Sequence, residues 1–438
     1  MSEPKTKKTV KKQKTGSLPL IQAVKGMSDI LPKNEDWWKY VWQAGFSVSE
    51  LHDFHYIETP ILEFVDLFER GVGGGTDIVE KQMYTLKTKG GDHLALRPEG
   101  TASIMRSYME HHLGYYALPL KVFYYGPMFR HERPQAGRER QFHQWGFEIV
   151  GDSDPIYDAE VIVVALNFLN SLKLKPLNLK INSVGCRVCR GNYRDKLRAY
   201  YQTKKGKICG DCERRLEKNP LRLLDCTEKD CREVRKDAPI ILDFLCQNCN
   251  NHLKSVLEIV EDNGIPYEPD PYLVRGLDYY NRTVFEIWSP SFDSALAGGG
   301  RYDYLSEMIS GRTVPAVGVA LGLERIIETL QKLEVVPALK SKHHVFFAAV
   351  GDQARKGSVR LMNILRHGGI AVIEAVGKKS LKSQLKAANK SKVPFALIYG
   401  QKEVFEKSVI IRDMRSGAQE TLMIEKFVDE VKQRFKSV

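Results

Sequence analysis

Residues 125–148 read YGPMFRHERPQAGRERQFHQWGFE, in which a polar segment rich in arginine separates two apolar runs. This order predicts a strand, a loop and a returning strand. Arg130, Arg138 and Arg140 lie near the loop, and guanidinium groups bind phosphate oxygens in a bidentate manner. The stretch therefore predicts a hairpin that presents arginines to a phosphorylated ligand. An exposed hairpin held by salt bridges is the alternative that composition alone leaves open.

The second strand of this hairpin carries further groups that suit a ligand. Phe142 offers an aromatic face for a base. Gln144 and Glu148 are an even number of residues apart, so they lie on one face of the strand. A stacking ring and two polar side chains beside the arginines predict a site for a nucleotide together with an amino acid.

The segments on either side of the hairpin predict an antiparallel sheet with helices. We expect strands at 94–96, 122–125, 142–150, 177–182 and 284–288, and helices at 35–52, 157–172 and 321–333. The glycines at 298–300 do not belong to a Walker loop or a dinucleotide fingerprint, so we expect them to allow close approach of the backbone. After Pro337, expected strands at 344–350, 370–375, 395–399 and 409–412 alternate with expected helices at 354–367, 381–391 and 424–435, which predicts a small α/β domain.

The positive charge is concentrated in three regions. The 438 residues carry a net charge of +12, to which residues 1–16 contribute +5, residues 181–258 contribute +6 and residues 343–438 contribute +9. The remainder is therefore at −8, an acidic core with three basic attachments. One long anionic ligand that touches all three would explain this distribution. Lysine-rich surfaces that only aid solubility are the alternative.

Composition also excludes some classes. No apolar run approaches the roughly 20 residues that span a bilayer, so we expect no membrane segment. The first 16 residues hold six lysines and no apolar core, which indicates a disordered tail rather than a secretory signal. We therefore expect a cytoplasmic protein.

The eight cysteines form four close pairs within residues 186–249: Cys186 and Cys189, Cys209 and Cys212, Cys226 and Cys231, Cys246 and Cys249. Without signs of secretion, this spacing favours metal binding over disulfides. Eight thiolates would make two closed four-cysteine sites for structural Zn²⁺. Three pairings of the close pairs are possible, and the sequence does not choose among them. Reduced core cysteines and an iron–sulfur cluster are the alternatives.

Residues 125–148 resemble the second sequence motif of class II aminoacyl-tRNA synthetases, in the form found in histidyl-tRNA synthetases of the bacterial type. Four other blocks resemble the same family: GMSDILP at 26–32, LRPEGT at 96–101, LVRGLDYY at 273–280, and AGGGRYD at 297–303 with GVALGLER at 318–325. The resemblance covers about residues 20–435, apart from the cysteine-rich insert. Cysteine pairs are not part of the family's general pattern.

The resemblance implies roles in binding ATP. Arg130 and Arg325 match the two arginines that define the class, which contact the α- and γ-phosphates. Glu132 matches the contact to the adenine amino group, Phe142 the ring that stacks on adenine, and Arg138 an arginine for the outer phosphates. The negative charge that grows on the phosphoryl oxygens would be stabilised by these guanidinium groups.

The resemblance also implies a histidine pocket. Arg275 matches the arginine that faces the α-phosphate from the opposite side, so Arg130, Arg275 and Arg325 are the expected catalytic residues. The expected histidine-binding residues are Arg97, Pro98, Glu99, Arg130, Gln144, Glu148, Arg275, Tyr279 and Tyr280. Carboxylate and hydroxyl groups can satisfy both nitrogens of an imidazole. A site built in this way rejects other amino acids, so no editing domain is expected.

The implied fold is an α+β catalytic core, a class II antiparallel sheet with helices, that carries an inserted cysteine-rich module and a C-terminal α/β anticodon-binding domain. The expected organisation is a disordered basic tail at 1–16, core at 17–180 and 259–335, zinc-binding module at 181–258, linker at 336–342 and anticodon-binding domain at 343–438. The implied partners are ATP with Mg²⁺, L-histidine, tRNA(His) and a second copy of the chain. The segment at 57–66, which contains Pro60, resembles the family's dimer-forming motif.

Two other functions are compatible with parts of this pattern. One is a catalytically inactive relative that regulates histidine biosynthesis, and the other is a class II synthetase for another amino acid. The presence of Arg130, Arg275, Arg325 and a C-terminal domain argues against the first. The block at 275–280 argues against the second.

Overall fold

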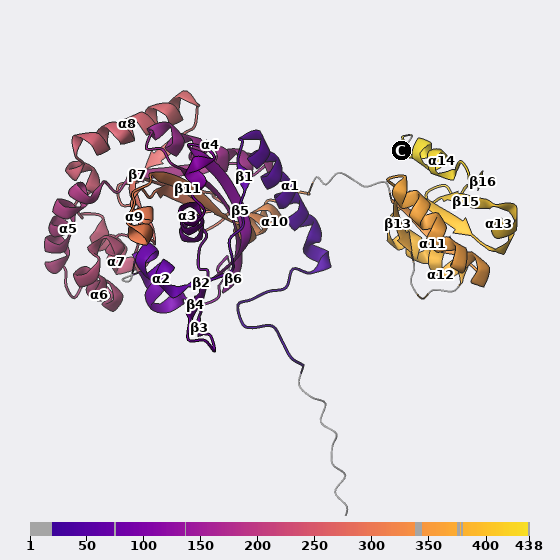
Figure 1. Cartoon of the computed structure of the whole chain (residues 1–438), viewed down its shortest axis with the longest axis horizontal. Coiled ribbons are helices and arrows are strands. Elements are labelled where there is room, and N and C mark those ends of the chain that lie inside the picture. Colours follow the sequence, from indigo (N-terminus) through magenta and orange to yellow (C-terminus); the bar gives the residue numbers. More distant parts are fainter. Residues whose placement is uncertain are drawn as a thin grey trace, which may run out of the picture. The chain divides into compact units, whose positions relative to one another are not determined.

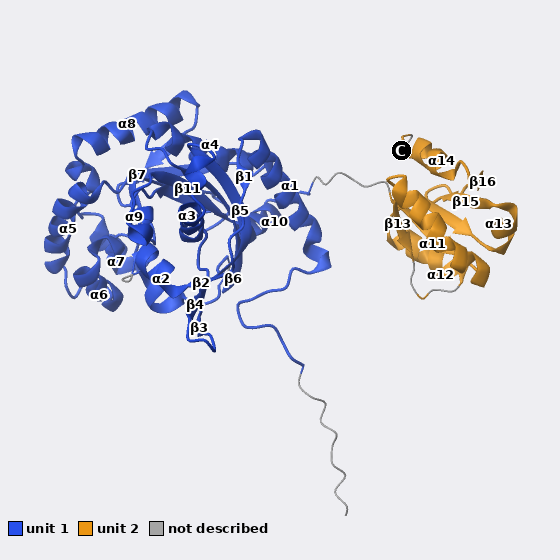
Figure 2. Ribbon diagram, in the orientation of Figure 1, with its two compact units in different colours: residues 1–338 blue, residues 339–438 orange. Residues whose placement is uncertain are grey.

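The computed structural model describes residues 20–73, 76–135, 137–337, 344–374, 377 and 380–436. The chain divides into two compact units, residues 1–338 and 339–438 (Figure 2). The expected disordered tail at 1–16 lies outside the described residues, as do residues 338–342 of the expected linker.

An eight-stranded mixed sheet forms the centre of the first unit (Figure 1). In spatial order its strands are β1 (His55–Tyr56), β5 (Leu120–Phe129), β6 (Gln141–Val150), β11 (Ala316–Gly322), β10 (Ala297–Arg301), β9 (Asn281–Trp288), β7 (Asn178–Ser183) and β8 (Tyr267–Pro269). The strands from β5 to β7 pair antiparallel, as predicted, whereas β1 and β8 pair parallel at the two edges. The predicted hairpin is the β5–β6 pair, in which Tyr125 lies opposite Trp145.

An aromatic cluster fixes how the first helix packs on this hairpin. The Trp145 ring is wholly buried and stacks between Phe123 and Tyr125 at centroid distances of 5.3 Å each. Phe46 of α1 (Glu35–Leu51) meets the Trp145 ring edge-on at 5.2 Å. A Cβ atom at Gly45 would lie 2.7 Å from the same ring, so only glycine allows this helix to approach so closely.

The other helices of the first unit lie against the sheet or its loops. α4 (Pro155–Ser171) packs on β6 and β11; its first turn is capped by the Asp154 carboxylate, which accepts a hydrogen bond of 2.9 Å from the Ile156 amide. The remaining elements are η1 (Pro32–Asn34), α2 (Val65–Phe68), η2 (Glu69–Gly73), η3 (Ile78–Gln82), α3 (Thr101–Glu110), η4 (Leu113–Tyr115), α9 (Leu305–Ser310), α10 (Leu323–Lys332) and a small sheet of β2 (Leu62–Phe64), β3 (Thr85–Lys87) and β4 (His93–Leu96). The helix predicted to begin at Leu321 begins at Leu323, because residues 316–322 pair with β6 and β10 as a buried strand.

The cysteine-rich segment between β7 and β9 is largely helical. It contains α5 (Arg187–Gln202), α6 (Gly210–Lys218), η5 (Pro220–Leu223), α7 (Lys229–Arg235), η6 (Ile241–Phe244) and α8 (Gln247–Asp262). Tyr193, Leu197, Tyr201 and Leu216 form a small buried core of their own there. α8 packs against α4 of the sheet domain.

The second unit is an α/β domain with a five-stranded sheet. The strand order is β13 (Ala371–Glu374), β12 (His344–Ala349), β14 (Phe395–Tyr399), β15 (Ser408–Asp413) and β16 (Gln419–Met423). The helices are α11 (Asp352–His367), α12 (Leu381–Lys390), α13 (Gln401–Glu406) and α14 (Phe427–Phe435). The last helix begins three residues later than predicted, and β16 and α13 are absent from the prediction. Among the described residues, no helix of either unit is long and apolar enough to cross a bilayer.

Candidate active site

A cavity of about 350 Å³ opens beside strands β6, β9, β10 and β11. Its lining contains most of the predicted ATP- and histidine-binding residues: Glu99, Arg130, Glu132, Arg138, Phe142, Gln144, Arg275, Tyr279, Tyr280 and Arg325. These residues come from the hairpin, the loop before α3, the segment before β9 and the first turn of α10. The sheet therefore brings together side chains that lie up to 226 positions apart in the sequence.

Two arginines of the cavity are held by backbone oxygens rather than by carboxylates. The Nε of Arg130 donates to the carbonyl of Pro98 at 2.8 Å, and its guanidinium lies 5.3 Å from the centre of the Phe142 ring. Arg325 donates to the carbonyls of Gly137 and Ala295 at 2.9 and 2.8 Å. Within the described part of the chain neither forms an ion pair, so their charge is available to an anion.

The positive charge in this part of the cavity is dense. Burial lowers the pKa of Arg325, and the nearby guanidinium groups of Arg138 and Arg130 lower it further. Arg138 lies 3.6 Å from Glu132. Three guanidinium groups around one opening form a strong site for a polyphosphate.

Arg275 approaches from the other side of the cavity. It forms an ion pair with Glu286 of β9, and its backbone carbonyl accepts a hydrogen bond of 3.2 Å from Arg222 of the insert. A Cβ atom at Gly298 of β10 would collide with the Arg275 guanidinium. The glycine-rich strand therefore makes room for this arginine, which is the close approach that the sequence predicts for residues 298–300.

Two buried glutamates lie at this end of the cavity, Glu99 in its lining and Glu148 behind the lining. Glu99 accepts hydrogen bonds of 2.8 Å from the Thr101 and Ala102 amides at the start of α3. Glu148 accepts hydrogen bonds from the hydroxyl groups of Thr101, at 2.7 Å, and Tyr302. Burial raises the pKa of Glu148 to about 8 and also raises that of Glu99. The carboxyl group of Glu99 can therefore accept hydrogen bonds from a cationic ligand, and the carboxyl group of either glutamate can give up a proton when such a ligand binds.

Several polar atoms that face this region have no partner among the described residues. They are Oη of Tyr124, Oε1 of Gln144 and Nε of Arg275, all three buried. Buried polar groups are nearly always paired in native proteins. Their grouping around one cavity indicates that a polar ligand completes the site.

Three predicted residues do not line the cavity directly. Arg97 is buried and donates to the carbonyl oxygens of Thr59 and Pro127 at 2.8 and 3.1 Å. Pro98 contributes the carbonyl that holds Arg130. Glu148 lies behind the lining, against Gly318, where a Cβ atom would collide with its carboxylate.

Sequence reasoning missed Thr101, Tyr124, Glu286 and Tyr302, which hold or border the predicted groups. Thr101 and Tyr302 belong to the blocks LRPEGT and AGGGRYD, so those blocks could have identified them. Tyr124 precedes the quoted hairpin stretch by one residue. Glu286 carries no local signal, because its role depends on the pairing of β9 with β10.

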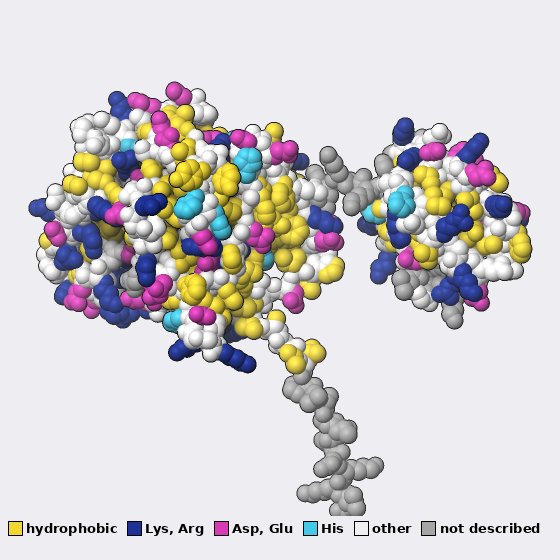
Figure 3. Space-filling model, viewed as in Figure 1, with side chains coloured by type: hydrophobic (Ala, Val, Ile, Leu, Met, Phe, Trp, Pro, Cys, Tyr) yellow, Lys and Arg dark blue, Asp and Glu magenta, His cyan; other side chains and the backbone are white. Residues whose placement is uncertain are grey.

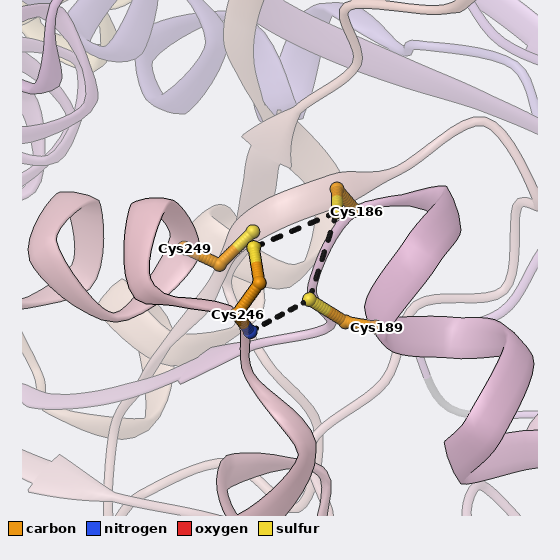
Figure 4. A group of neighbouring side chains, drawn as sticks. All are labelled: Cys186, Cys189, Cys246 and Cys249. Atoms are coloured by element: carbon orange, nitrogen blue, oxygen red, sulfur yellow. Dashed lines mark hydrogen bonds between the residues drawn. The ribbon is translucent and has the colours of Figure 1, made fainter.

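The cysteines gather into two groups of four, which selects one of the three possible pairings. Cys186 and Cys189 lie with Cys246 and Cys249, and Cys209 and Cys212 lie with Cys226 and Cys231. The Sγ atom of Cys186 is 3.6 Å from that of Cys189 and 4.0 Å from that of Cys246 (Figure 4). In the second group, Sγ of Cys209 lies 3.8 Å from that of Cys226. These separations are too long for a disulfide, which requires about 2 Å.

The local structure around both groups directs amide donors at sulfur, whereas burial raises the pKa of Cys189, Cys212, Cys231 and Cys249, so the thiolate forms of these four need a further positive partner such as a metal ion. Cys186, Cys209 and Cys246 are the residues that cap the N-termini of α5, α6 and α8, and their partners three positions later lie in the first turn. The amides of Cys246 and Cys209 donate to Sγ of Cys189 and Cys231 at 3.1 and 3.2 Å. Helix N-termini and amide donors stabilise negative charge on sulfur.

A largely antiparallel sheet with arginines from a hairpin and from a following helix around one cavity is the core of a class II aminoacyl-tRNA synthetase. A family model described as histidyl-tRNA synthetase matches residues 26–326, and one described as anticodon binding domain matches residues 344–434. The chain belongs to the histidyl-tRNA synthetase family.

Known proteins agree with this assignment. The chain is 42% identical to a histidine–tRNA ligase of Halothermothrix orenii over 94% of this chain and 99% of that protein. An apo histidyl-tRNA synthetase from S. aureus has a similar structure, with a TM-score of 0.79 and 34% identity over 94% of this chain and all of that one. A Bacillus halodurans protein described as an ATP phosphoribosyltransferase regulatory subunit/histidyl-tRNA synthetase shares the fold, with a TM-score of 0.62 and 21% identity over 87% of this chain and 99% of that one.

Proposed function

We propose that this chain is a histidine–tRNA ligase that works in two steps. In the first, a carboxylate oxygen of L-histidine attacks the α-phosphorus of ATP, the bond to the β-phosphate breaks, and pyrophosphate leaves. In the second, the 3′-hydroxyl of the terminal adenosine of tRNA(His) attacks the carbonyl carbon of histidyl-adenylate, and AMP leaves. The observation that carries the proposal is one cavity that holds the unpaired Arg130 and Arg325 on one side and the buried carboxylate of Glu99 on the other.

The arginine side suits ATP. Arg130 and Arg325 are held by carbonyl oxygens, so they can meet the α- and γ-phosphates without first breaking an ion pair. Phe142 lies against Arg130 and offers its ring to adenine. Glu132 is proposed to accept from the adenine amino group and Arg138 to bind the outer phosphates. Mg²⁺ that arrives with ATP supplies further neutralisation of the phosphate charge.

Arg275 completes the charge stabilisation. Its partner in the structure is Glu286. When the reactants bind, the Arg275 guanidinium would shift part of its interaction from the Glu286 carboxylate to the α-phosphate. Positioned guanidinium groups stabilise the charge that develops on the α-phosphate, so the reaction needs no proton-transfer base on the protein.

The carboxylate side suits histidine. Glu99 lines the cavity and can receive its ammonium group, and Gln144, Tyr279 and Tyr280 supply further acceptors and donors. Glu148 lies behind the lining and would act on the ligand through the hydroxyl groups of Thr101 and Tyr302 that it holds. Arg97 and Pro98 would act by holding the backbone on which Arg130 and Glu99 depend. An amino acid without the imidazole would leave these buried groups unpaired, which costs about 10⁴–10⁵ in specificity.

We infer that each cysteine group binds one structural Zn²⁺ ion. A tetrahedral site with Zn–S bonds of about 2.3 Å places its sulfur atoms about 3.8 Å apart. The separations of 3.6, 3.8 and 4.0 Å in the two groups match this value. Elemental analysis of purified protein should give two zinc ions per chain, and a value below one would contradict the inference.

The partners follow from the family and from the surface. The α/β unit at 344–434 is proposed to bind the anticodon stem of tRNA(His). The segment at 57–66 is proposed to form a homodimer, and the apolar side chains of Ile61, Leu62 and Phe64 are exposed there. We further propose that the enzyme is cytoplasmic.

Histidine-dependent exchange of pyrophosphate into ATP tests the activity. Exchange with histidine and with no other amino acid, followed by charging of tRNA(His), is the expected result. Exchange supported by another amino acid would indicate a synthetase of different specificity. The absence of any exchange would indicate a regulatory relative.

A further inference from the structure

A second cavity, of about 480 Å³, lies between the cysteine-rich insert and the loop that carries Arg275. α5 and the corner between α6 and η5 form one wall, and residues 274–280 form the other. The lining contains one carboxylate, Asp278, and six cationic side chains: Arg187, Arg190, Arg194, Lys218, Arg222 and Arg275. Figure 3 shows Lys and Arg side chains gathered on this part of the first unit, over α5 and α6.

Four of the six cations already have carboxylate partners. Arg187 pairs with Glu307 at 3.0 Å, Lys218 with Glu80 at 2.8 Å, Arg222 with Asp77 at 3.2 Å, and Arg275 with Glu286. The charges of these four are therefore largely balanced before any ligand binds.

Arg190 and Arg194 are different. Arg190 donates to the carbonyl of Tyr280 at 3.0 Å, and Arg194 donates to the carbonyl of Lys218 at 3.5 Å. Among the residues that the structure describes, no carboxylate lies within ion-pair distance of either. They are four positions apart on α5, so they share a helix face and repel each other.

The cavity shares a wall with the candidate active site. Arg275, Leu277 and Tyr280 line both cavities. Asp278, on the same loop, is held by the side chain of Asn219 at 2.8 Å and by its own amide, which donates to the carbonyl of Val72 at 3.1 Å. A ligand in the second cavity would therefore contact the loop that shapes the first.

We propose that Arg190 and Arg194 bind a phosphate group in this cavity. Guanidinium groups bind phosphate oxygens bidentately, and an anion between them would remove their mutual repulsion. Two sources can supply the group: a backbone phosphate of tRNA near its acceptor end, an alternative that rests on the proposed function, or free inorganic phosphate or pyrophosphate. The volume accommodates either.

Gly191 offers a sharp test, because it lines the same cavity on α5 and a Cβ atom there would meet nothing within 4 Å. Gly191→Glu places a carboxylate beside the two arginines, where it competes with phosphate. Gly191→Gln has nearly the same shape without the charge and is the matched control. Both substitutions replace glycine inside a helix, so both should fold.

Arg194→Gln removes one of the two cations, and Arg198→Gln, on the same helix but paired with Asp195, is its control.

Three readouts on the full chain distinguish the sources. If the phosphate comes from tRNA, Gly191→Glu and Arg194→Gln should raise the KM for tRNA(His) about fivefold or more, while histidine-dependent pyrophosphate exchange and the two controls stay unchanged. The slope of log affinity against log salt should also fall by about one in Arg194→Gln. If the phosphate is free, sodium phosphate should raise the melting temperature of the wild type above that in sodium chloride of equal ionic strength, and both variants should lose this increase. The proposal would be overturned if Gly191→Glu and Arg194→Gln both kept the wild-type KM for tRNA(His) and the wild-type response of the melting temperature to phosphate.

Discussion

Asn219 of the cysteine-rich insert donates a hydrogen bond of 2.8 Å to Asp278, which lies one residue before the two tyrosines of the proposed histidine pocket. Asn219 directly follows α6, which has Cys209 as its N-cap residue and Cys212 in its first turn. The insert therefore reaches the active site through a short chain of contacts that begins at the second cysteine group.

We expect Asn219→Ala to raise the KM for histidine in the exchange assay by about three- to tenfold, with little change in the KM for ATP. The loss of this bond leaves Asp278 partly buried without its amide donor, which costs roughly 1–2 kcal/mol. Gln247→Ala, which removes an exposed contact of the insert far from Asp278, is the control. Equal changes in the two variants would contradict the role given to Asn219.

Removal of metal from the second cysteine group should have the same effect. Cys226 follows η5, so the metal would hold α6 and η5 from both sides. Cys226→Ser is expected to raise the KM for histidine at least as much as Asn219→Ala, with loss of one zinc per chain. A variant that loses the zinc and keeps a wild-type KM for histidine would separate the metal from the pocket.

Local signals predicted the parts of the site that lie on single elements. The hairpin could be read from residues 125–148 because strand, loop and strand are contiguous, and the positions of Arg130 and Phe142 follow from it. The partners of buried groups could not be read in this way, because Tyr302 reaches Glu148 only through the order of β6, β11 and β10. The sequence could not choose the grouping of the cysteine pairs for the same reason, since that grouping depends on how α5 and α8 pack in the folded chain.

Two errors in the secondary structure have similar causes. The helix predicted at 321–333 took in the last two residues of β11, because the apolar run of this strand continues directly into the apolar face of α10. β16 was missed because four of its five residues are exposed, so the strand shows no alternation of apolar and polar side chains. Edge and buried strands are identified by their neighbours more than by their own sequence.

Glu148 should make the stability of the protein fall as pH rises. Burial raises its pKa to about 8, and the charge of Glu99 adds to this, while the hydrogen bonds from Tyr302 and Thr101 oppose it. Between about pH 4.5 and 8 the folded protein keeps a proton that the unfolded chain has released, so each pH unit costs up to about 1.4 kcal/mol of unfolding free energy. The contribution is fully present below pH 4.5 and is lost as pH rises through 8.

Glu148→Gln removes this titration. In urea unfolding at pH 6, 7 and 8, the free energy of unfolding of Glu148→Gln relative to that of the wild type should increase with each pH unit. The control variant Glu258→Gln, at an exposed position, should show no such increase. Parallel curves for the wild type and Glu148→Gln would show that the carboxyl is already ionised in the folded protein at pH 6.

Arg275→Ala should reduce adenylate formation far more than tRNA binding. The guanidinium lies where Gly298 makes room for it and is directed by Glu286, so its loss removes transition-state stabilisation worth about 10²–10³ in rate. Single-turnover adenylate formation measures the first effect and filter binding of tRNA(His) the second. Arg275→Lys keeps the positive charge without the planar guanidinium group, so its rate of adenylate formation should lie between those of the wild type and the alanine variant. Similar losses in adenylate formation and tRNA binding would contradict a role at the α-phosphate.

The ion pair between Arg301 and Asp158 should contribute strongly to the stability of the first unit. Both side chains are wholly buried, and Nε of Arg301 donates to Oδ2 of Asp158 at 2.9 Å. The other oxygen of Asp158 lies 3.1 Å from Nε2 of His252, so this carboxylate joins β10, α4 and α8. Among the described residues, Asp158→Asn leaves Arg301 with only Asp303 as a charged partner, which should cost about 3–5 kcal/mol.

The urea midpoint of the first unit, followed by tryptophan fluorescence, measures this loss, because all five tryptophans lie in residues 1–338. Asp195→Asn, which breaks an exposed pair with Arg198, is the matched control and should change stability by less than about 0.5 kcal/mol. Because α8 ends the insert and packs on α4, the loss in Asp158→Asn should also loosen the first cysteine group, and zinc should leave that group at lower chelator concentration. A destabilised protein whose zinc release is unchanged would show that the insert is held to the core by other contacts.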